Sequence, residues 1–271
     1  MKKLIAMLLA VTMVLAFAGC AGGGTETTSA PETTEAPETP GAVETTEAVE
    51  TTGAEETTGA AETTEAAEVA VMTHEEYAAA ELETPVCVET YVQAHQSWWD
   101  GKITVYCQSP DGAYFAYEMA CSEEDAEKLV PGTKIRINGY KGEWSGEVEI
   151  LDGTFTFVED GDTYIAEALD VTELLGTEEL IEHQNEFVSF TGLTVENIAY
   201  KNDEPGDDIY LTLGYNGESY EFCVEVYLTG TDSEVYTAVG ELEVGDVVNV
   251  EGFLYWYEGV NPHITAISAA E

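Results

Sequence analysis

From Val71 to the end of the chain, apolar and polar residues alternate in short runs that are separated by glycine, proline and aspartate. Alternation with a period of two is typical of β-strands with one buried face, and the interruptions are typical of turns. The first half of this region predicts five strands, at residues 86–92, 103–107, 113–120, 134–139 and 147–158. Ser122 is a good N-cap with Asp125 three residues later, so a short helix is expected before Pro131 and Gly132, between the third and fourth strands.

The same order recurs in the second half, where runs at residues 187–195, 209–213 and 220–228 predict three more strands. Residues 129–140 and 242–253 indicate a repeat, because each contains a strand that starts after a glycine and ends at a glycine followed by an aromatic residue. The second glycines, Gly139 and Gly252, would allow the sharp bend of a small barrel. Helix signals between Asp170 and His183 indicate a connector. We therefore expect domains at residues 71–162 and 185–271, joined by a helical connector at residues 163–184.

The first twenty residues combine Lys2 and Lys3 with an apolar run and a small-residue site that ends in Cys20. This pattern is typical of a secretion signal. Ala18-Gly19-Cys20 after the leucine-rich run resembles the lipid-attachment site of bacterial lipoproteins. The resemblance implies a signal peptide at residues 1–19, lipidation of Cys20 and a position on the extracytoplasmic face of a bacterial cell membrane. An ordinary cleaved signal peptide is the alternative.

Residues 20–70 form the predicted linker, which after Cys20 is nearly all Thr, Glu, Ala, Gly and Pro and has no aromatic residue. Such a composition cannot bury a core, and its like charges repel one another. We therefore expect a disordered tether that lifts the folded part away from the membrane.

Five strands with a helix between the third and the fourth are the arrangement of the OB-fold, a small Greek-key barrel. The predicted fold class is therefore mainly β, with two tandem OB-fold-like small β-barrels after a lipoprotein signal peptide and a disordered linker. The repeated phrase around Gly245 and Gly252 resembles bacterial OB-fold domains attached to exported proteins. The first copy, with YVQAHQSWWDGK, DGAYFAYEMAC and GYKGEWSGEVEI, resembles uncharacterised surface lipoproteins of anaerobic Gram-positive bacteria. That resemblance implies no assigned activity, and a fold by itself does not specify a function.

The chain has 54 acidic and 8 basic residues and a formal net charge of −46. From residue 71 onward, 42 acidic residues stand against 6 basic ones. Such a field repels phosphate backbones, because nucleic-acid binding depends on basic groups that displace counterions. No nucleic-acid partner is therefore expected, and cations, cationic peptides or neutral sugars are favoured. The charge would also keep an exposed protein soluble without any ligand.

The usual ligand face of an OB-fold lies on its second and third strands and on the loops that join strands 1 to 2 and 4 to 5. Aromatic residues at these places would stack on a sugar ring or a peptide side chain. The candidate ligand-binding residues are Trp98, Trp99 and Trp144 in the first copy and Tyr200, Tyr255, Trp256 and Tyr257 in the second. The alternative is that part of this set packs inward and closes the barrels.

Motifs of known catalytic sites, such as G-x-S-x-G, H-E-x-x-H or a phosphate-binding glycine loop, do not occur in the sequence. No catalytic residue and no cofactor is therefore predicted. Glu143, Glu147 and Glu149 leave open a glycosidase acid and base, which require two carboxylates about 5 to 10 Å apart.

Acidic turns at residues 159–162 and 203–208 offer oxygen ligands for calcium, but neither matches an EF-hand loop, and solvated turns are favoured. The four histidines lack the spacing of metal ligands, so no metal site is predicted.

After lipidation of Cys20, four cysteines remain in a compartment that permits disulfides. An antiparallel first hairpin would bring Cys87 close to Cys107, which makes these two the best candidates for a disulfide within one domain. The alternative, for a protein from an anaerobe, is that Cys87, Cys107, Cys121 and Cys223 are all buried thiols.

These observations favour a lipid-anchored extracellular binding module without enzymatic activity, whose ligand is a wall glycan, an oligosaccharide or a protein partner. One alternative is an accessory assembly subunit of a transporter or secreted enzyme. The other is a hydrolase that depends on the carboxylates named above.

Overall fold

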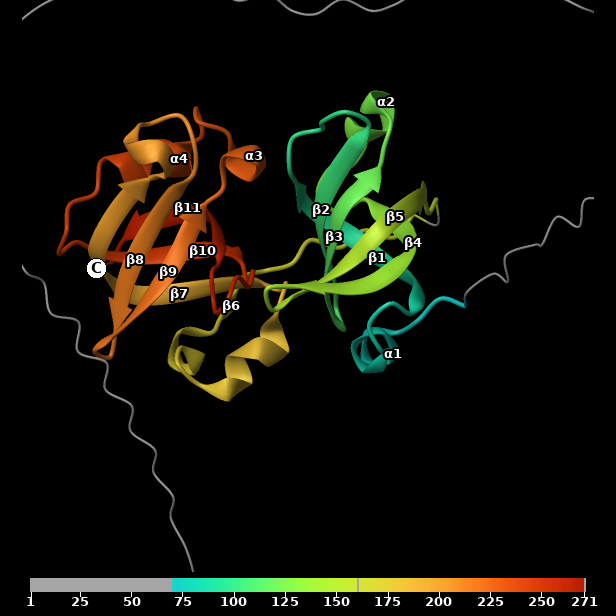
Figure 1. The fold of residues 1–271 in the computed structure, drawn as a ribbon, viewed down its shortest axis with the longest axis horizontal. Coiled ribbons are helices and arrows are strands. Elements are labelled where there is room, and N and C mark those ends of the chain that lie inside the picture. Colours follow the sequence, from blue (N-terminus) through green and yellow to red (C-terminus); the bar gives the residue numbers. More distant parts are fainter. Residues whose placement is uncertain (1–69, 160, 271) are drawn as a thin grey trace, which may run out of the picture. The chain divides into compact units, whose positions relative to one another are not determined.

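The structure, a computed structural model, describes residues 70–159 and 161–270. The predicted signal peptide, Cys20 and all but the last residue of the predicted linker lie outside the described residues. In Figure 1 the strands between residues 85 and 157 run from teal to yellow-green, and those between residues 187 and 269 run from gold to red. Both sets of strands belong to one compact unit. No helix in the described part of the chain is long and apolar enough to span a membrane.

The first set of strands forms a closed five-stranded barrel, in the order β1-β2-β3-β5-β4. β3 and β5 run parallel, whereas the other neighbouring strands are antiparallel. The strands are β1 (Pro85–His95), β2 (Lys102–Ser109), β3 (Gly112–Ala120), β4 (Lys134–Trp144) and β5 (Glu147–Phe157). α2 (Glu123–Ala126) lies between β3 and β4. This is the strand order of an OB-fold, as the alternation predicts.

The alternation of β2 shows why these residues form a barrel wall. Ile103, Val105 and Cys107 are buried in the barrel core, while the residues between them point to the outer face. Burial of an aliphatic side chain such as Ile103 or Val105 stabilises the fold by about 1.5–3 kcal/mol relative to an exposed position. Ser122 accepts a hydrogen bond from the backbone N–H of Asp125, which confirms the predicted N-cap of α2.

A further helix, α1 (His74–Ala79), precedes the first barrel and is absent from the prediction. Thr73 and Glu76 cap its start with reciprocal hydrogen bonds. The ammonium group of Lys141 in β4 donates to the carbonyl oxygens of Tyr77, Ala78 and Ala80 at distances of 3.1, 2.7 and 2.9 Å. These three bonds hold the end of α1 against the barrel.

The second set of strands repeats this topology. Its six-stranded sheet has the order β10-β11-β9-β8-β7-β6, and an additional pairing of β10 with β7 completes the same five-strand circuit. β9 and β11 are parallel, as β3 and β5 are. The strands are β6 (Leu169–Asp170), β7 (Phe187–Tyr200), β8 (Ile209–Tyr215), β9 (Glu218–Val224), β10 (Val247–Phe253) and β11 (His263–Ala269). The two tandem OB-fold-like barrels of the prediction are therefore confirmed.

Helical segments fill the connections of the second barrel. They are the 3-10 helices η1 (Thr172–Leu174), η2 (Glu178–His183) and η3 (Lys201–Asp203) and the α-helices α3 (Val226–Thr229) and α4 (Glu234–Gly240). The helix signals of the connector thus correspond to two short 3-10 helices. The strand predicted at residues 220–228 is wrong at its end, because β9 stops at Val224 and Glu225 caps α3.

Gly139 and Gly252 occupy equivalent places in the two barrels, where the pairing of β4 with β5 and of β10 with β11 shifts register. At Gly252 a Cβ atom would collide with the backbone carbonyl of His263, and at Gly139 it would lie 2.7 Å from the carbonyl oxygen of Leu151. The close approach of two backbones therefore requires glycine at both bends.

The register of the first hairpin corrects the proposed proximity of two cysteines. Val92, and not Cys87, lies opposite Cys107, while Cys87 lies opposite Asn138 on β4. Cys87, Cys107, Cys121 and Cys223 are all buried thiols. Burial raises the pKa of the Cys107 and Cys223 thiols well above the ordinary range, so they act as small core residues.

Candidate functional site

The outer face of β2 and β3, called here the β2–β3 face, is the part of an OB-fold that usually binds ligands. Alternation places Thr104 and Tyr106 of β2 and Phe115 and Tyr117 of β3 on this outer side, because their neighbours fill the barrel core. The face divides into a covered half and an open half.

The covered half packs against the second barrel in a cluster that we call the joint. Tyr106 stacks on Phe253 with ring centroids 4.6 Å apart, and Phe115 meets the ring of Tyr255 edge-on at 5.3 Å. Phe187 and Leu228 pack against the same cluster. The second barrel therefore occupies part of the surface on which an isolated OB-fold would bind a ligand.

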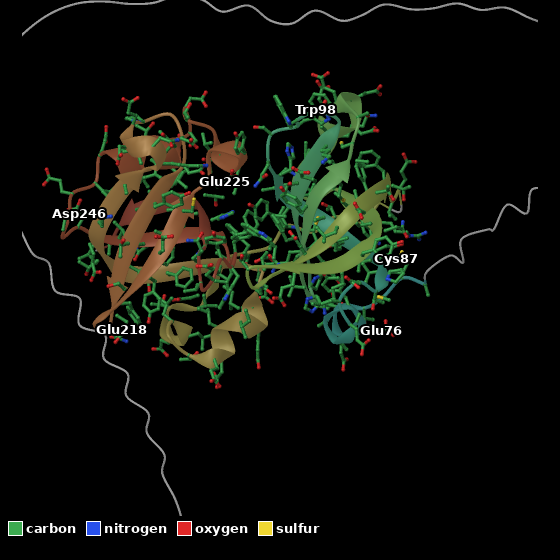
Figure 2. All side chains as sticks on the ribbon, viewed as in Figure 1. Glu76, Cys87, Trp98, Glu218, Glu225 and Asp246 are labelled. Carbon is green, nitrogen blue, oxygen red and sulfur yellow. The ribbon has the colours of Figure 1, made fainter. Side chains whose placement is uncertain are left out.

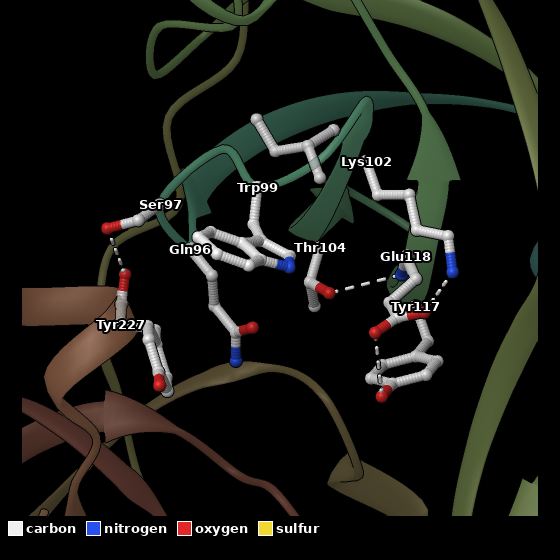
Figure 3. Close-up of a pocket in the computed structure, with 9 residues that line it drawn as sticks. Gln96, Ser97, Trp99, Lys102, Thr104, Tyr117, Glu118 and Tyr227 are labelled. Carbon is white, nitrogen blue, oxygen red and sulfur yellow. Dashed lines mark hydrogen bonds and ion pairs between the residues drawn. The ribbon is translucent and has the colours of Figure 1, made fainter. Parts of the chain in front are cut away.

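The open half forms a pocket of about 340 Å³ (Figure 3). Three aromatic side chains border it and remain accessible: Trp99 is 78% exposed, Tyr117 42% and Tyr227 60%. Trp99 comes from the β1–β2 loop, Tyr117 from β3 and Tyr227 from α3 of the second barrel. The remaining lining residues are Gln96, Ser97, Lys102, Ile103, Thr104 and Glu118.

Glu118 carries the negative charge of the pocket and is held in one place by three contacts (Figure 3). Its carboxylate lies 2.6 Å from the ammonium group of Lys102 and accepts a hydrogen bond of 3.2 Å from the Tyr117 hydroxyl. Its backbone N–H donates to the hydroxyl of Thr104. The hydrogen bond from Lys102 lowers the pKa of Glu118, so the carboxylate is charged at neutral pH. Donors and acceptors thus stand beside the aromatic rings in a fixed arrangement.

The β1–β2 loop is fastened on both sides. The backbone N–H and the hydroxyl of Ser97 both donate to the carbonyl oxygen of Tyr227, at 2.7 and 3.2 Å. The indole N–H of Trp98 donates to the carbonyl of Cys121 at 2.9 Å. Trp99 and Lys102 exchange backbone hydrogen bonds across the turn, so the Trp99 ring stands at a rigid loop tip.

Buried carboxyl groups lie beside the joint. One oxygen of Glu147 accepts hydrogen bonds from the backbone N–H of Trp256 and from the amide of Gln184, at 2.9 and 3.2 Å. Its other oxygen and one oxygen of Glu225 have no hydrogen-bond partner among the described residues. Burial raises the pKa of Glu147 well above its ordinary value and raises the pKa of both Glu149 and Glu225 to about 7.

The burial of these carboxyl groups decides whether they could serve as the acid and base of a glycosidase. Glu147 is fully buried and Glu149 nearly so, while Glu143 is exposed on β4. The pair that could act as acid and base is therefore covered by protein rather than open to a substrate.

In the described part of the chain, no group of three or more His, Cys, Asp or Glu side chains is arranged to hold a metal ion. In the acidic turn at residues 203–208, Lys201 pairs with both Asp207 and Asp208.

The structure separates the aromatic candidates into three places. Trp98 and Trp99 belong to the loop at the pocket. Trp144 and Tyr257 form an exposed pair at the β4–β5 and β10–β11 loops, with ring centroids 5.1 Å apart. The remaining three are partly buried: Tyr200 and Trp256 pack against the second core, and Tyr255 packs in the joint, where it stacks on His263.

Of the 9 residues that line the pocket, the sequence-based set contains only Trp99, and it misses the two other exposed aromatic rings, Tyr117 and Tyr227, and the carboxylate of Glu118. The alternation of β3 contains the signal for Tyr117, since it follows Phe115 on the outer side. No local signal indicates Tyr227, because its helix begins inside a run that alternates like a strand.

No protein-family model and no curated protein matches the sequence. The structure is similar to a murine DNA-binding protein bound with double-stranded DNA, at 13% identity and a TM-score of 0.35, covering 68% of this chain and 96% of that chain. A HINa domain in complex with 20-bp double-stranded DNA shares 13% identity at a TM-score of 0.31, covering 70% and 97%. A putative aspartyl-tRNA synthetase from Leishmania major Friedlin shares 15% identity at a TM-score of 0.29, covering 41% and 22%. Similarity this distant carries no argument about function, and the OB-fold assignment rests on the strand order and pairing described above.

Proposed function

We propose that this chain is a lipid-anchored, extracytoplasmic binding module without enzymatic activity, and that its pocket binds a neutral saccharide such as a wall glycan or an oligosaccharide. The observation that carries the proposal is the pocket itself: three exposed aromatic rings line it together with the ion pair of Lys102 and Glu118, on the usual ligand face of an OB-fold.

The chemistry of the lining residues suits a sugar. Aromatic faces pack against the C–H faces of a pyranose ring, and the amide of Gln96, the carboxylate of Glu118 and the ammonium group of Lys102 offer partners for its hydroxyl groups. The volume of about 340 Å³ lies near the lower end of ligand pockets, which span about 300–1,000 Å³. A mono- or disaccharide unit matches this size.

The anchor and the position outside the cell rest on the sequence. The leader and Cys20 favour attachment to a membrane, and the acidic linker favours an extended tether. A module held in this way would reach glycans around the cell surface.

Charge argues against a nucleic acid as ligand of this chain. Each of the six Lys and Arg side chains from residue 71 onward already has protein partners: Lys102 with Glu118, Lys128 with Glu124 and Asp125, Lys134 and Arg136 with Glu89, Lys201 with Asp207 and Asp208, and Lys141 with the end of α1. A phosphate backbone would have to displace an acidic group to reach these cations. Glu147 and Glu149 are buried, so a substrate would not reach this pair of carboxyl groups, and their burial supports a module without enzymatic activity.

The test is binding of the full-length chain, kept in detergent, to cellobiose, chitobiose, maltose and their longer homologues, to purified wall glycan and to short duplex DNA. We expect saccharide binding that is lost in Trp99→Ala and kept in Trp144→Ala, an exposed tryptophan outside the pocket. Circular dichroism should show both variants folded. If no saccharide binds, or if DNA binds in a salt-sensitive way, the proposal is wrong.

A further inference from the structure

One wall of the pocket on the first barrel belongs to the second barrel. Tyr227 lies in α3, whereas the other lining residues lie in the β1–β2 loop, β2 and β3 (Figure 3). Its side chain borders the space from the side opposite Tyr117 and Glu118 in this view. The site is therefore incomplete on the first barrel alone.

The position of this wall is determined by both barrels. On its own side, Glu225, the N-cap of α3 (labelled in Figure 2), accepts a hydrogen bond from the backbone N–H of Tyr227, and Asp208 accepts one from Val226 at 2.9 Å. On the other side, Ser97 donates two hydrogen bonds to the carbonyl of Tyr227. α3 is a single turn, and hydrogen bonds to residues of both barrels hold it in place.

The same turn also reaches the joint. Leu228, the neighbour of Tyr227, packs against the cluster of Tyr106, Phe115 and Phe253. A change in how the barrels meet would therefore move Tyr227 relative to Trp99. Conversely, a molecule that contacts both rings would favour the arrangement in which the barrels are docked.

The geometry points to a clamp: a neutral disaccharide unit is held with one ring against Trp99 and the other against Tyr227, so the second barrel determines the length of saccharide that the pocket selects. This inference rests on the proposed function and adds the size of the ligand and the role of the second barrel. Tyr227 is then a specificity-determining residue, and saccharide binding is linked to docking of the two barrels.

The experiment measures, by titration calorimetry on the full-length chain, the affinity for cellobiose, chitobiose and maltose and for the monosaccharide of each. We expect at least one disaccharide to bind tenfold or more tightly than its monosaccharide. Tyr227→Ala should abolish that difference and leave the monosaccharide affinity within twofold, whereas Tyr227→Phe should retain it. Tyr257→Ala is the matched control, because Tyr257 is an exposed tyrosine of the same barrel outside the pocket.

The outcomes separate the two proposals. If the wild type binds saccharides, Trp99→Ala abolishes binding and Tyr227→Ala binds disaccharides like the wild type, the clamp is wrong and the proposed function stands. If the wild type binds no saccharide, both are wrong. Hydrogen exchange gives an independent readout: the bound disaccharide should slow exchange in residues 96–99 and in residues 225–229 together, and slowing in the first segment alone would overturn the clamp.

Discussion

The hydroxyl of Tyr106 lies 2.6 Å from Nδ1 of His263, and this hydrogen bond joins the two barrels inside the joint. Both side chains are buried. Burial raises the pKa of Tyr106 and lowers the pKa of His263 to about 3, so both groups are neutral at neutral pH. A polar link between neutral groups thus lies among the aromatic rings of the joint, beside which the pocket lies.

Removing one partner of this bond should weaken the protein. Tyr106→Phe keeps the ring against Phe253 but leaves the buried Nδ1 of His263 without its hydroxyl partner, which costs about 1–3 kcal/mol. Urea unfolding should show a lower midpoint. Tyr140→Phe is the control, since Tyr140 is half exposed, and equal midpoints for the two variants would contradict this role of the bond.

The buried carboxyl groups predict that stability falls as pH rises. Between about pH 4.5 and 7 the folded protein holds protons on Glu149 and Glu225 that the unfolded chain, with its carboxyl pKa at 4.5, has released. The free energy of unfolding therefore decreases through this range as pH rises. His263 opposes the trend below pH 6.5, because only the unfolded chain binds its proton there. With Glu147 also raised, the carboxyl groups outnumber the imidazole, and urea midpoints at pH 5 should exceed those at pH 8.

Glu225→Gln tests the origin of that dependence. The substitution removes a charge that burial and nearby Asp208 disfavour, so the variant should lose part of the pH dependence. Its free energy of unfolding minus that of the wild type should increase by about 1–3 kcal/mol between pH 5 and pH 8. Glu218→Gln changes an exposed glutamate of the same barrel and should leave the profile of the wild type. A Glu225→Gln profile as steep as that of the wild type would show that folding does not raise the pKa of Glu225.

The barrels were predictable because the signals that define them are local. Alternation at Ile103 and Val105 identifies a wall strand, Ser122 identifies a helix start, and the glycines at 139 and 252 identify the bends. α1 also has a local signal, the capping pair of Thr73 and Glu76, which a search for strands overlooks.

The site was predictable only in part, because tertiary contact decides what an aromatic residue does. Trp99 and Trp256 both lie in loops between strands, yet one stands exposed at the pocket and the other packs against the second core. Alternation shows which side of a strand a residue faces. It does not show that a second barrel covers Tyr106 and leaves Tyr117 open.

The bend at Gly252 predicts a large effect of a small substitution. In Gly252→Ala the new methyl group would collide with the carbonyl of His263 in the paired strand, so β10 and β11 would have to separate at a cost of about 1–3 kcal/mol or more. Gly192→Ala is the comparison, because nothing lies near its Cβ position and only its positive φ adds a cost of about 1–2 kcal/mol. Thermal unfolding should rank Gly252→Ala below Gly192→Ala, and the reverse order would contradict the close approach of the two backbones.

The contact between Lys141 and the end of α1 leads to a prediction that does not involve the second barrel. Its buried ammonium group satisfies three carbonyl oxygens at the end of α1, and no acidic side chain is among these bonds. Lys141→Met retains most of the aliphatic side chain but removes the donors, so the end of α1 should detach from β4 while the barrel remains folded. Hydrogen exchange in residues 73–80 should accelerate by tenfold or more, with little change in β2 and β3. Lys128→Met removes an exposed ammonium group that bonds only surface carboxylates, and it should leave exchange in α1 unchanged. Equal protection of α1 in both variants would mean that its other contacts, among them the packing of Tyr77, hold the helix in place without Lys141.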